Sequence, residues 1–307
     1  MKKKILTLGL ISTMAISMVA CNNNEENNSE IRTTESVEKE STTGEDTTSK
    51  ETTEVTTEVK ETEKESTTIE ETTIALEDLT DEYLLSLPEN PAEDFKYIEI
   101  EGGVEITGRN IKSNKNKIVV VPSQIDGKDV IEISDDVFLN SNFAAVVLSK
   151  NLKSTDMGLF RQSKTRKVVL PEGLEIIGTR TFEYSSLKEV NIPNTVKVIR
   201  TEAFSVSDIE EIFIPKSVET IEAGAFSGCS SLKTVIFEGC PSKIELRSIG
   251  GSNGVNKVIC LDGNIEFAKN EFRDTFGGRN DVTFVAPAGS KVEQYAKDGG
   301  FEFEELK

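Results

Sequence analysis

Two stretches of the chain, Glu189-Val-Asn-Ile-Pro-Asn-Thr-Val196 and Glu211-Ile-Phe-Ile-Pro-Lys-Ser-Val218, are copies of one pattern offset by 22 residues. Each copy continues through an isoleucine, Ile199 or Ile221, to a phenylalanine. Chance does not produce such a series, so the sequence predicts an array of stacked repeats. The phenylalanine recurs every 22 residues, at Phe138, Phe160, Phe182, Phe204 and Phe226.

Each unit begins with a short strand in which alternate residues point to the same side. The proline after it has no amide proton and ends the strand. A second apolar pair, such as Val196 and Ile199, then leads to the phenylalanine, which fills the far side of the coil. One unit cannot bury these side chains alone, whereas units stacked about 4.8 Å apart form a continuous core. We therefore predict a β-rich solenoid with the inward residues Val168, Leu170, Val190, Ile192, Ile212 and Ile214.

The units resemble the BspA-like, treponemal-type leucine-rich repeat of bacterial surface proteins, most closely at residues 190–204 and 212–226. The resemblance covers roughly residues 95–307 and implies a leucine-rich-repeat-like solenoid with repeats of about 22 residues. It also implies a hairpin cap over residues 95–117 and a closing strand and helix over residues 282–307. After Phe226 the pattern is less regular: Glu238 takes a proline position, and the spacing recovers between Leu261 and Phe272.

The first 20 residues have the pattern of a secretory signal peptide. Lys2, Lys3 and Lys4 precede an apolar run of 15 residues, which is too short to span a bilayer as a helix. The run ends in Met18-Val-Ala-Cys21, which resembles the lipobox of bacterial lipoproteins. The resemblance implies cleavage before Cys21 and lipidation of its thiol; an ordinary signal peptidase site is the alternative.

Residues 21–75 are predicted to form a disordered linker anchored at Cys21. They are almost entirely Thr, Glu, Ser, Asn and Lys, and residues 22–76 carry 16 acids and 5 bases. Such a segment buries too little apolar surface to offset the backbone entropy of ordering, roughly 1–2 kcal/mol per residue. A flexible chain of this length spans about 40 Å on average, and like charges extend it.

Residues 76–94 are expected to form a short helix and a connector. Residues 76–87 place Leu79, Tyr83, Leu84 and Leu87 on one helix face, and Pro88 ends the helix. We expect this face to pack on the first coil of the solenoid.

Composition argues against an enzyme and against nucleic-acid binding. The formal net charge is −19, and such a surface repels nucleic acid. The chain has no histidine, which removes His-dependent nucleophiles and His-bearing zinc sites. Asp135-Asp136 and the paired glycines at 250–251 and 277–278 are isolated features. The sequence predicts no catalytic residue, no cofactor and no metal site.

Three cysteines remain if Cys21 is lipidated, and we interpret them mainly as core residues. Cys260 takes the inward position that Ile192 and Ile214 hold in their units. Cys229 lies in the turn after Phe226, where the resembled family often has a buried cysteine. A Cys229–Cys240 disulfide stays open as an alternative, since spacing alone does not determine the Cα separation.

The residue between the two inward positions of each strand must point outward, and seven of eight such residues are apolar: Val120, Val147, Val169, Asn191, Phe213, Ile236, Ile259 and Val285. We call this column the outer stripe. Strand propensity by itself favours Val and Ile on either face. A contiguous exposed apolar stripe also marks partner sites. The candidate partner-binding residues are Val147, Val169, Asn191, Phe213, Ile236 and Ile259.

Together these features predict a cell-surface lipoprotein on the extracellular face of the membrane that presents its solenoid to a partner. The partner is an extracellular protein, matrix or glycan, and the membrane is contacted only through the lipid. Adhesion is what the resemblance implies. The alternative is a structural envelope component that binds neighbouring surface proteins or wall polymer.

Overall fold

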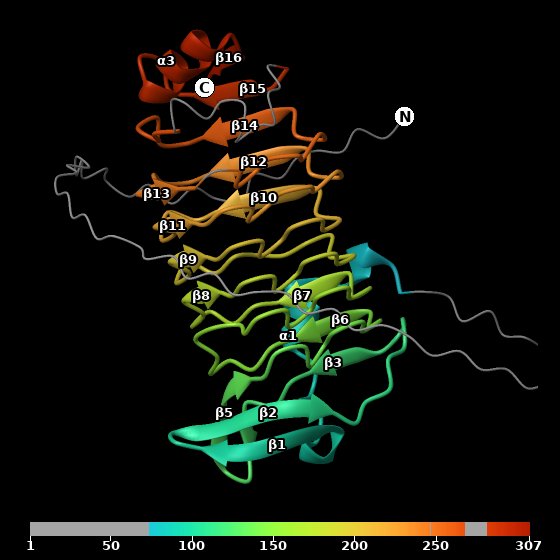
Figure 1. The fold of residues 1–307 in the computed structure, drawn as a ribbon. Coiled ribbons are helices and arrows are strands. Elements are labelled where there is room, and N and C mark those ends of the chain that lie inside the picture. Colours follow the sequence, from blue (N-terminus) through green and yellow to red (C-terminus); the bar gives the residue numbers. More distant parts are fainter. Residues whose placement is uncertain (1–73, 246, 268–280) are drawn as a thin grey trace, which may run out of the picture. The chain divides into compact units, whose positions relative to one another are not determined.

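The computed structural model describes residues 74–245, 247–267 and 281–307, which form a β-solenoid of about eight turns (Figure 1). The predicted fold class is therefore confirmed. The signal peptide, Cys21, the linker up to residue 73 and Phe272 lie outside the described residues.

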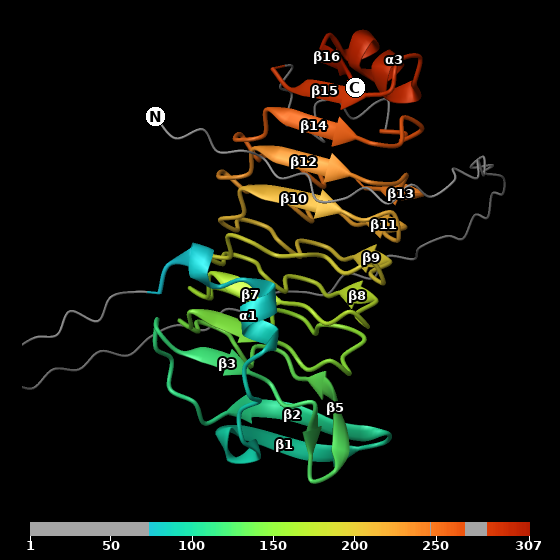
Figure 2. The same ribbon diagram turned by 180° about the vertical axis from the view of Figure 1, so that it is seen from behind.

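One side of the solenoid, which we call the long face, is built from parallel strands that follow one another in chain order (Figure 2). They form a three-stranded and a five-stranded sheet, and a bridge from Lys167 to Glu189 continues the stack from the first sheet into the coil between them. The strands are β3 (Ile118–Val120), β6 (Ala145–Val147), β7 (Lys167–Val169), β10 (Glu211–Ile214), β12 (Thr234–Phe237), β14 (Lys257–Cys260), β15 (Thr283–Ala286) and β16 (Glu302–Glu305).

The opposite side carries a second parallel sheet of two-residue strands, each reached after the turn that follows a long-face strand. In the regular coils a proline occupies this turn, as at Pro171, because it cannot donate to the ladder. The short strands are β8 (Ile176–Ile177), β9 (Val198–Ile199), β11 (Thr220–Ile221) and β13 (Lys243–Ile244).

Both ends of the stack are closed. The first end is a hairpin of β1 (Phe95–Ile100) and β2 (Gly103–Arg109), turned at Gly102 with a φ of 88° that favours glycine. The same sheet contains β4 (Gln124–Ile125) and β5 (Lys128–Ile133), and η2 (Ala92–Asp94) leads into it. At the other end α3 (Lys291–Gly299) lies between β15 and β16, which pair in parallel.

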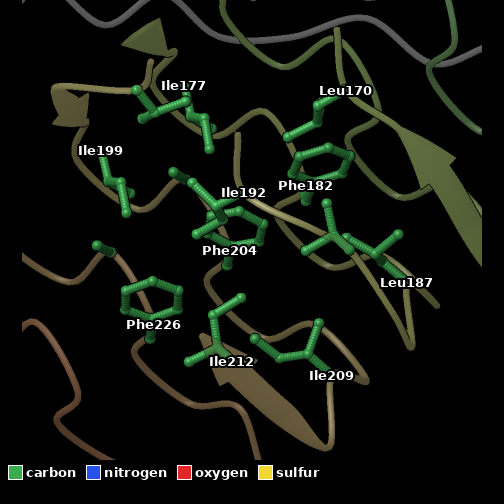
Figure 3. Packing of buried hydrophobic residues seen from close by; sticks show 14 of the residues in the cluster. Leu170, Ile177, Phe182, Leu187, Ile192, Ile199, Phe204, Ile209, Ile212 and Phe226 are labelled. Atoms are coloured by element: carbon green, nitrogen blue, oxygen red, sulfur yellow. The ribbon is translucent and has the colours of Figure 1, made fainter. Parts of the chain in front are cut away.

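The phenylalanine column forms the centre of the core (Figure 3). Phe138, Phe160, Phe182, Phe204 and Phe226 are buried, and successive rings stack with centroids 4.9–5.3 Å apart. The predicted inward strand residues belong to the same buried cluster. The stacking register expected from the 22-residue spacing is confirmed, because each ring packs on the ring one repeat away.

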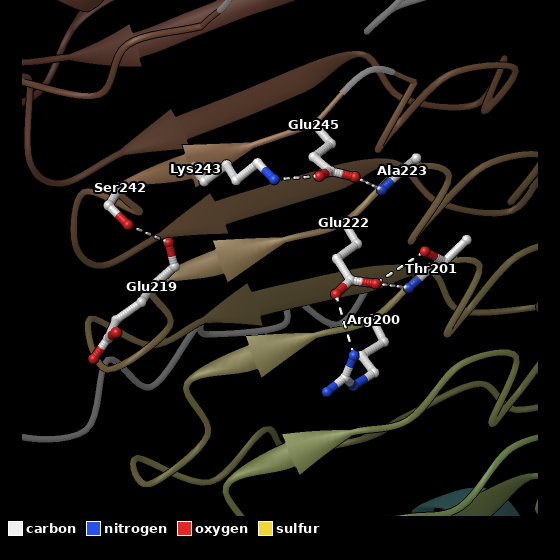
Figure 4. A network of polar contacts seen from close by, with 8 residues as sticks. All are labelled: Arg200, Thr201, Glu219, Glu222, Ala223, Ser242, Lys243 and Glu245. Carbon is white, nitrogen blue, oxygen red and sulfur yellow. Dashed lines mark hydrogen bonds and ion pairs between the residues drawn. The ribbon is translucent and has the colours of Figure 1, made fainter. Parts of the chain in front are cut away.

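Carboxylates lock neighbouring coils together beside the second sheet (Figure 4). Glu222 accepts hydrogen bonds from the backbone N–H and the hydroxyl of Thr201, at 2.8 and 2.9 Å. Glu245, one coil later, accepts from the N–H of Ala223 at 2.9 Å. The hydrogen bond from Lys243 to Glu245 lowers the pKa of this carboxyl. Each glutamate thus satisfies a backbone donor of the preceding coil, a structural role.

Residues 74–87 form a strap that crosses the long face (Figure 2). The strap contains a 3₁₀ turn, η1 (Leu76–Asp78), and a short helix, α1 (Asp81–Leu85). The prediction of one helix over residues 76–87 is therefore wrong. Thr80 is extended, with φ −68° and ψ 149°, and its side chain caps the second helix. This break changes the helical phase, so Leu79 and Leu84 are buried while Tyr83 faces solvent.

Candidate functional site

The outer stripe exists as an aligned column on the long face. Parallel pairing places Val120 beside Val147 and Val147 beside Val169, and later Phe213 beside Ile236 and Ile236 beside Ile259. Their strand neighbours, such as Val146 and Val168, belong to the main core, whereas Val147 and Val169 do not. The predicted alternation of inward and outward residues is therefore confirmed.

The expectation that the whole stripe is exposed is wrong for its first part. Val147 and Val169 are only 5% and 7% exposed, although they point away from the core. The reason is the strap, whose Leu79 and Leu84 form a second, separate apolar cluster with Val120, Val147 and Val169. This part of the stripe is thus occupied by the protein's own chain.

Polar contacts hold the strap in place. The Asp81 carboxylate lies 2.8 Å from the ammonium group of Lys167 and also accepts a hydrogen bond from the Asn191 amide. The Arg166 guanidinium donates to the carbonyl of Ile74 at 2.5 Å. Lys167 is buried, so its charge requires the Asp81 partner. The strap is therefore bound by both its leucines and its carboxylate.

Asn90, just after the strap, forms a further contact with β3, the first strand of the long face. Asn90 donates its backbone N–H to the carbonyl of Val120 and accepts from the N–H of Val120 through its side chain, both at 2.8 Å. These bonds satisfy backbone groups on the outer edge of β3, which otherwise offers a template for strand pairing.

The rest of the stripe is open, and we call Asn191, Phe213, Ile236 and Ile259 the open half. Phe213 is 43% exposed, Ile236 and Ile259 are half-buried, and Asn191 is exposed. The open half ends at Val285, which is buried; a 2.9 Å ion pair between Lys257 and Glu304 joins the two strands on either side of β15.

A groove of about 480 Å³ lies where the strap meets the open half. It extends from the end of α1 to Phe213, so the covered and open halves of the stripe adjoin the same hollow. Its lining includes Asp81, Leu85, Pro171, Asn191, Pro193 and Phe213. Leu85 is exposed beside it and adds an apolar wall from the strap.

Acidic side chains border the open half. Glu211 is exposed on β10 two residues before Phe213, and Glu238 follows β12 two residues after Ile236. Glu238 accepts from the backbone N–H of Lys216 at 3.0 Å. Lys257 stands on the same side as Glu211 but pairs with Glu304. The site is an apolar row with one carboxylate on each margin, Glu211 on one side and Glu238 on the other.

Cys229 and Cys260 are buried core residues, as predicted, and the Cys229–Cys240 disulfide is absent because Cys229 is a free thiol. The Cys229 thiol donates to the carbonyl of Phe204 at 3.0 Å and lies 3.5 Å from the Ser207 hydroxyl. Burial raises the pKa of both core thiols. A protonated, buried thiol is a poor nucleophile.

Acidic residues also gather near the hairpin end, where burial raises the pKa of Asp156 to about 6, with further contributions from Asp135, Glu132 and Glu105. In the described residues, no group of three or more His, Cys, Asp or Glu side chains is arranged to hold a metal ion. Burial and repulsion from the neighbouring carboxylates therefore make the ionised form of Asp156 unfavourable in the folded protein.

Asp156→Asn is expected to stabilise the protein at neutral pH. Because the pKa is higher in the folded than in the unfolded state, ionised Asp156 costs stability, and this cost develops as pH rises from about 4 to above 6. Raising the pKa of this carboxyl from its ordinary value to about 6 corresponds, after a discount for partial solvent exposure, to roughly 1–2 kcal/mol. Melting curves should show the variant melting higher at pH 7.5 and alike at pH 3.5. Equal curves at both pH values would contradict the assignment.

Sequence reasoning identified the stripe but missed the residues that divide it, Asp81 and Lys167. Lys167 is a strand-starting residue in the sequence, and its burial depends on a segment about 86 positions earlier. The sequence feature that pointed to this cover was the apolar pair Leu79 and Leu84. The pair was predicted to pack on the first coil, but the sequence did not indicate which side of the coil it contacts.

Residues 127–273 match the model of the BspA type leucine rich repeat region in six copies. The chain thus contains BspA-type repeats. A leucine-rich repeat protein from Bacteroides ovatus is similar in structure, with 20% identity, a TM-score of 0.50 and coverage of 71% of this chain and 67% of that one. The leucine-rich repeat protein of T. pallidum has 22% identity, a TM-score of 0.50 and coverage of 71% and 98%. No curated protein sequence matches significantly.

These similarities show the fold and the repeat type. Among residues 74–245, 247–267 and 281–307, the helices are all too short and too polar to be membrane spans.

Proposed function

We propose that this protein is a lipid-anchored cell-surface binding module that holds an extracellular polypeptide on the open half of its outer stripe. Leucine-rich-repeat proteins are typically non-enzymatic binding proteins, which supports a binding role in general. Export, an anchor at Cys21 and an acidic linker of about fifty residues all suit contact at a distance from the membrane.

The observation that carries this proposal is the aligned apolar row of Phe213, which is exposed, and Ile236 and Ile259, which are half-buried. The first part of the stripe is equally apolar, and there the protein covers it with two leucines of its own. An apolar row that is covered at one half and open at the other, next to a groove, is a surface that a partner can complete.

The double variant Phe213→Asp, Ile236→Asp tests the proposal. Both side chains point away from the core, so the free energy of unfolding should fall by no more than about 1 kcal/mol per site, and the solenoid should stay folded. Retention of the full chain on extracellular matrix or on intact partner cells should fall strongly, since aromatic and aliphatic anchors dominate interface energies. Both quantities are measured on the same preparation.

Tyr184→Asp, Val206→Asp is the matched control, because these residues are exposed on adjacent coils but lie outside the stripe. Retention that falls equally in both variants, or in neither, would contradict the proposal. Retention on isolated wall fragments in place of matrix would favour the alternative of a structural envelope component, which uses the same stripe.

The anchor has its own test in Cys21→Ser. Loss of the thiol removes the lipid acceptor, so the variant should appear in the medium or stay unprocessed at the membrane. Phase partition and the mass of the protein measure this. A variant of mature mass that still enters the detergent phase would contradict lipidation of Cys21.

A further inference from the structure

The strap shows how a polypeptide binds this face. Leu79 and Leu84 pack on Val147 and Val169, while Asp81 reaches Lys167 and Asn191. Lys167 lies two residues before Val169 on the same strand. The strap therefore contacts two neighbouring columns of outward-pointing residues: the outer stripe and the column two residues before it. Its leucines pack on the outer stripe, and its carboxylate contacts both Lys167 in the column beside the stripe and Asn191 in the stripe itself.

That second column changes its charge along the solenoid. Its members, two residues before the stripe on each coil, are Lys167, Glu189, Glu211, Thr234 and Lys257. Lys167 is taken by Asp81 and also lies 3.5 Å from Glu189. Lys257 forms an ion pair with Glu304. Within the described residues, Glu211 has no ion-pair partner, and it stands two residues before Phe213, the most exposed apolar residue of the open half.

The apolar column continues while the charge beside it reverses. Where the strap meets a lysine beside Val169, a second segment would meet a carboxylate beside Phe213, with Glu238 on the other margin. A partner that repeated the strap's own chemistry would place a carboxylate against Glu211 and be repelled. A cationic side chain at that position would be attracted, and the chain's net charge of −19 would assist its approach.

We propose that the open half takes a polypeptide segment that docks as the strap does, with apolar side chains on Phe213, Ile236 and Ile259 and with a lysine or arginine on Glu211. This inference rests on the proposed function and specifies the partner's chemistry. The groove that adjoins both halves places the incoming segment next to Leu85, as a continuation of an interface already present. The acidic linker of residues 22–73 has the wrong charge for this role.

Two synthetic peptides with the strap sequence of residues 74–90 provide the probe. Both carry Glu77→Gln, Asp78→Asn, Glu82→Gln and Glu89→Gln to remove the other side-chain charges, and one also carries Asp81→Lys. Each is titrated against the full chain and against its Glu211→Lys variant. Isoleucine methyl signals locate the binding: Ile236 and Ile259 should shift, whereas Ile177 and Ile199 on the opposite sheet should not.

The Asp81→Lys peptide should bind the native chain roughly five-fold more tightly than its Asp81 counterpart, the scale of about 1 kcal/mol for an exposed ion pair. Glu211→Lys should reverse the order, and added salt should shrink the difference. Glu238→Gln controls for a general loss of negative charge and should preserve most of the preference.

Equal affinities of the two peptides, a preference that survives Glu211→Lys, or shifts confined to other methyl groups would overturn the inference. Failure of both peptides to bind at millimolar concentration would overturn it as well. These outcomes are separable from the proposed function: if Phe213→Asp, Ile236→Asp abolishes matrix retention while the peptides show no charge preference, the stripe binds a partner of different chemistry.

Discussion

Phe204→Ala is expected to lower the free energy of unfolding by about 3–5 kcal/mol, the usual cost of removing a fully buried aromatic side chain. The ring lies between Phe182 and Phe226, with centroids 5.1 Å from each, so its loss leaves a cavity between two stacked neighbours. Neighbouring coils cannot collapse into this cavity, because inter-coil hydrogen bonds such as that from Phe204 N–H to the Ala225 carbonyl, 2.7 Å, hold their spacing. Chemical denaturation measures the loss.

The damage should also be local. A coil contacts only its neighbours, so amide exchange should accelerate most in the coils of Phe182 and Phe226 and least at the terminal caps. Tyr184→Ala is the control: this aromatic residue is 57% exposed one coil earlier and should change stability little. A near-neutral Phe204→Ala would contradict the stacked register.

Leu84→Ala is expected to release the strap. Leu84 is fully buried against the valines of the stripe, and its truncation should cost about 2–4 kcal/mol of the strap's docking energy. Because the strap can detach while the solenoid remains intact, the effect should appear as local opening and only weakly in the global melt. Amide exchange and proteolysis within residues 81–90 should increase roughly 30-fold or more, the factor that 2 kcal/mol represents.

Leu85→Ala provides the matched control, since this neighbour on the same helix is exposed. It should leave exchange across the strap close to that of the native chain. Released Val147 and Val169 would extend the open half, so the Leu84→Ala variant should also bind more of a hydrophobic dye. Unchanged exchange in this variant would mean that Asp81 and Arg166 alone hold the strap.

The outer stripe is divided into a half that the protein's own strap covers and a half to which we assign partner binding as a proposal. Next to β3, β6 and β7 the apolar row stabilises the N-terminal segment of the same chain. Next to β10, β12 and β14 it is open and bordered by carboxylates. Because Asp81 pairs with Lys167 and would meet the carboxylate of Glu211 two coils later, we expect the flanking charge to favour the strap's observed position.

Local pattern was sufficient for most of the fold. The 22-residue phenylalanine spacing predicted which residues stack, because every coil repeats the same path and places Phe182 above or below Phe204 without reference to distant segments. Strand alternation likewise predicted that Val168 faces the core and Val169 faces away. Burial of Cys260 followed from its position in the repeat, since it takes the inward place that Ile192 and Ile214 hold, whereas burial of Cys229 was implied by the resemblance to the repeat family.

What the sequence by itself determined is the periodic part of this protein: the solenoid, its core column and the direction in which each strand residue points. Only the tertiary structure decided which outward residues are free, because that depends on a contact between residues 74–87 and coils as much as about 110 positions away. The strap's path results from the helix break at Thr80 and from the ion pair between Asp81 and Lys167. Neither feature belongs to the 22-residue repeat, so the sequence periodicity could not predict it. Stacking can be predicted from the repeat because each coil contacts only its neighbours. Burial of outward residues by a non-repeated segment depends on the path of that segment in the folded protein.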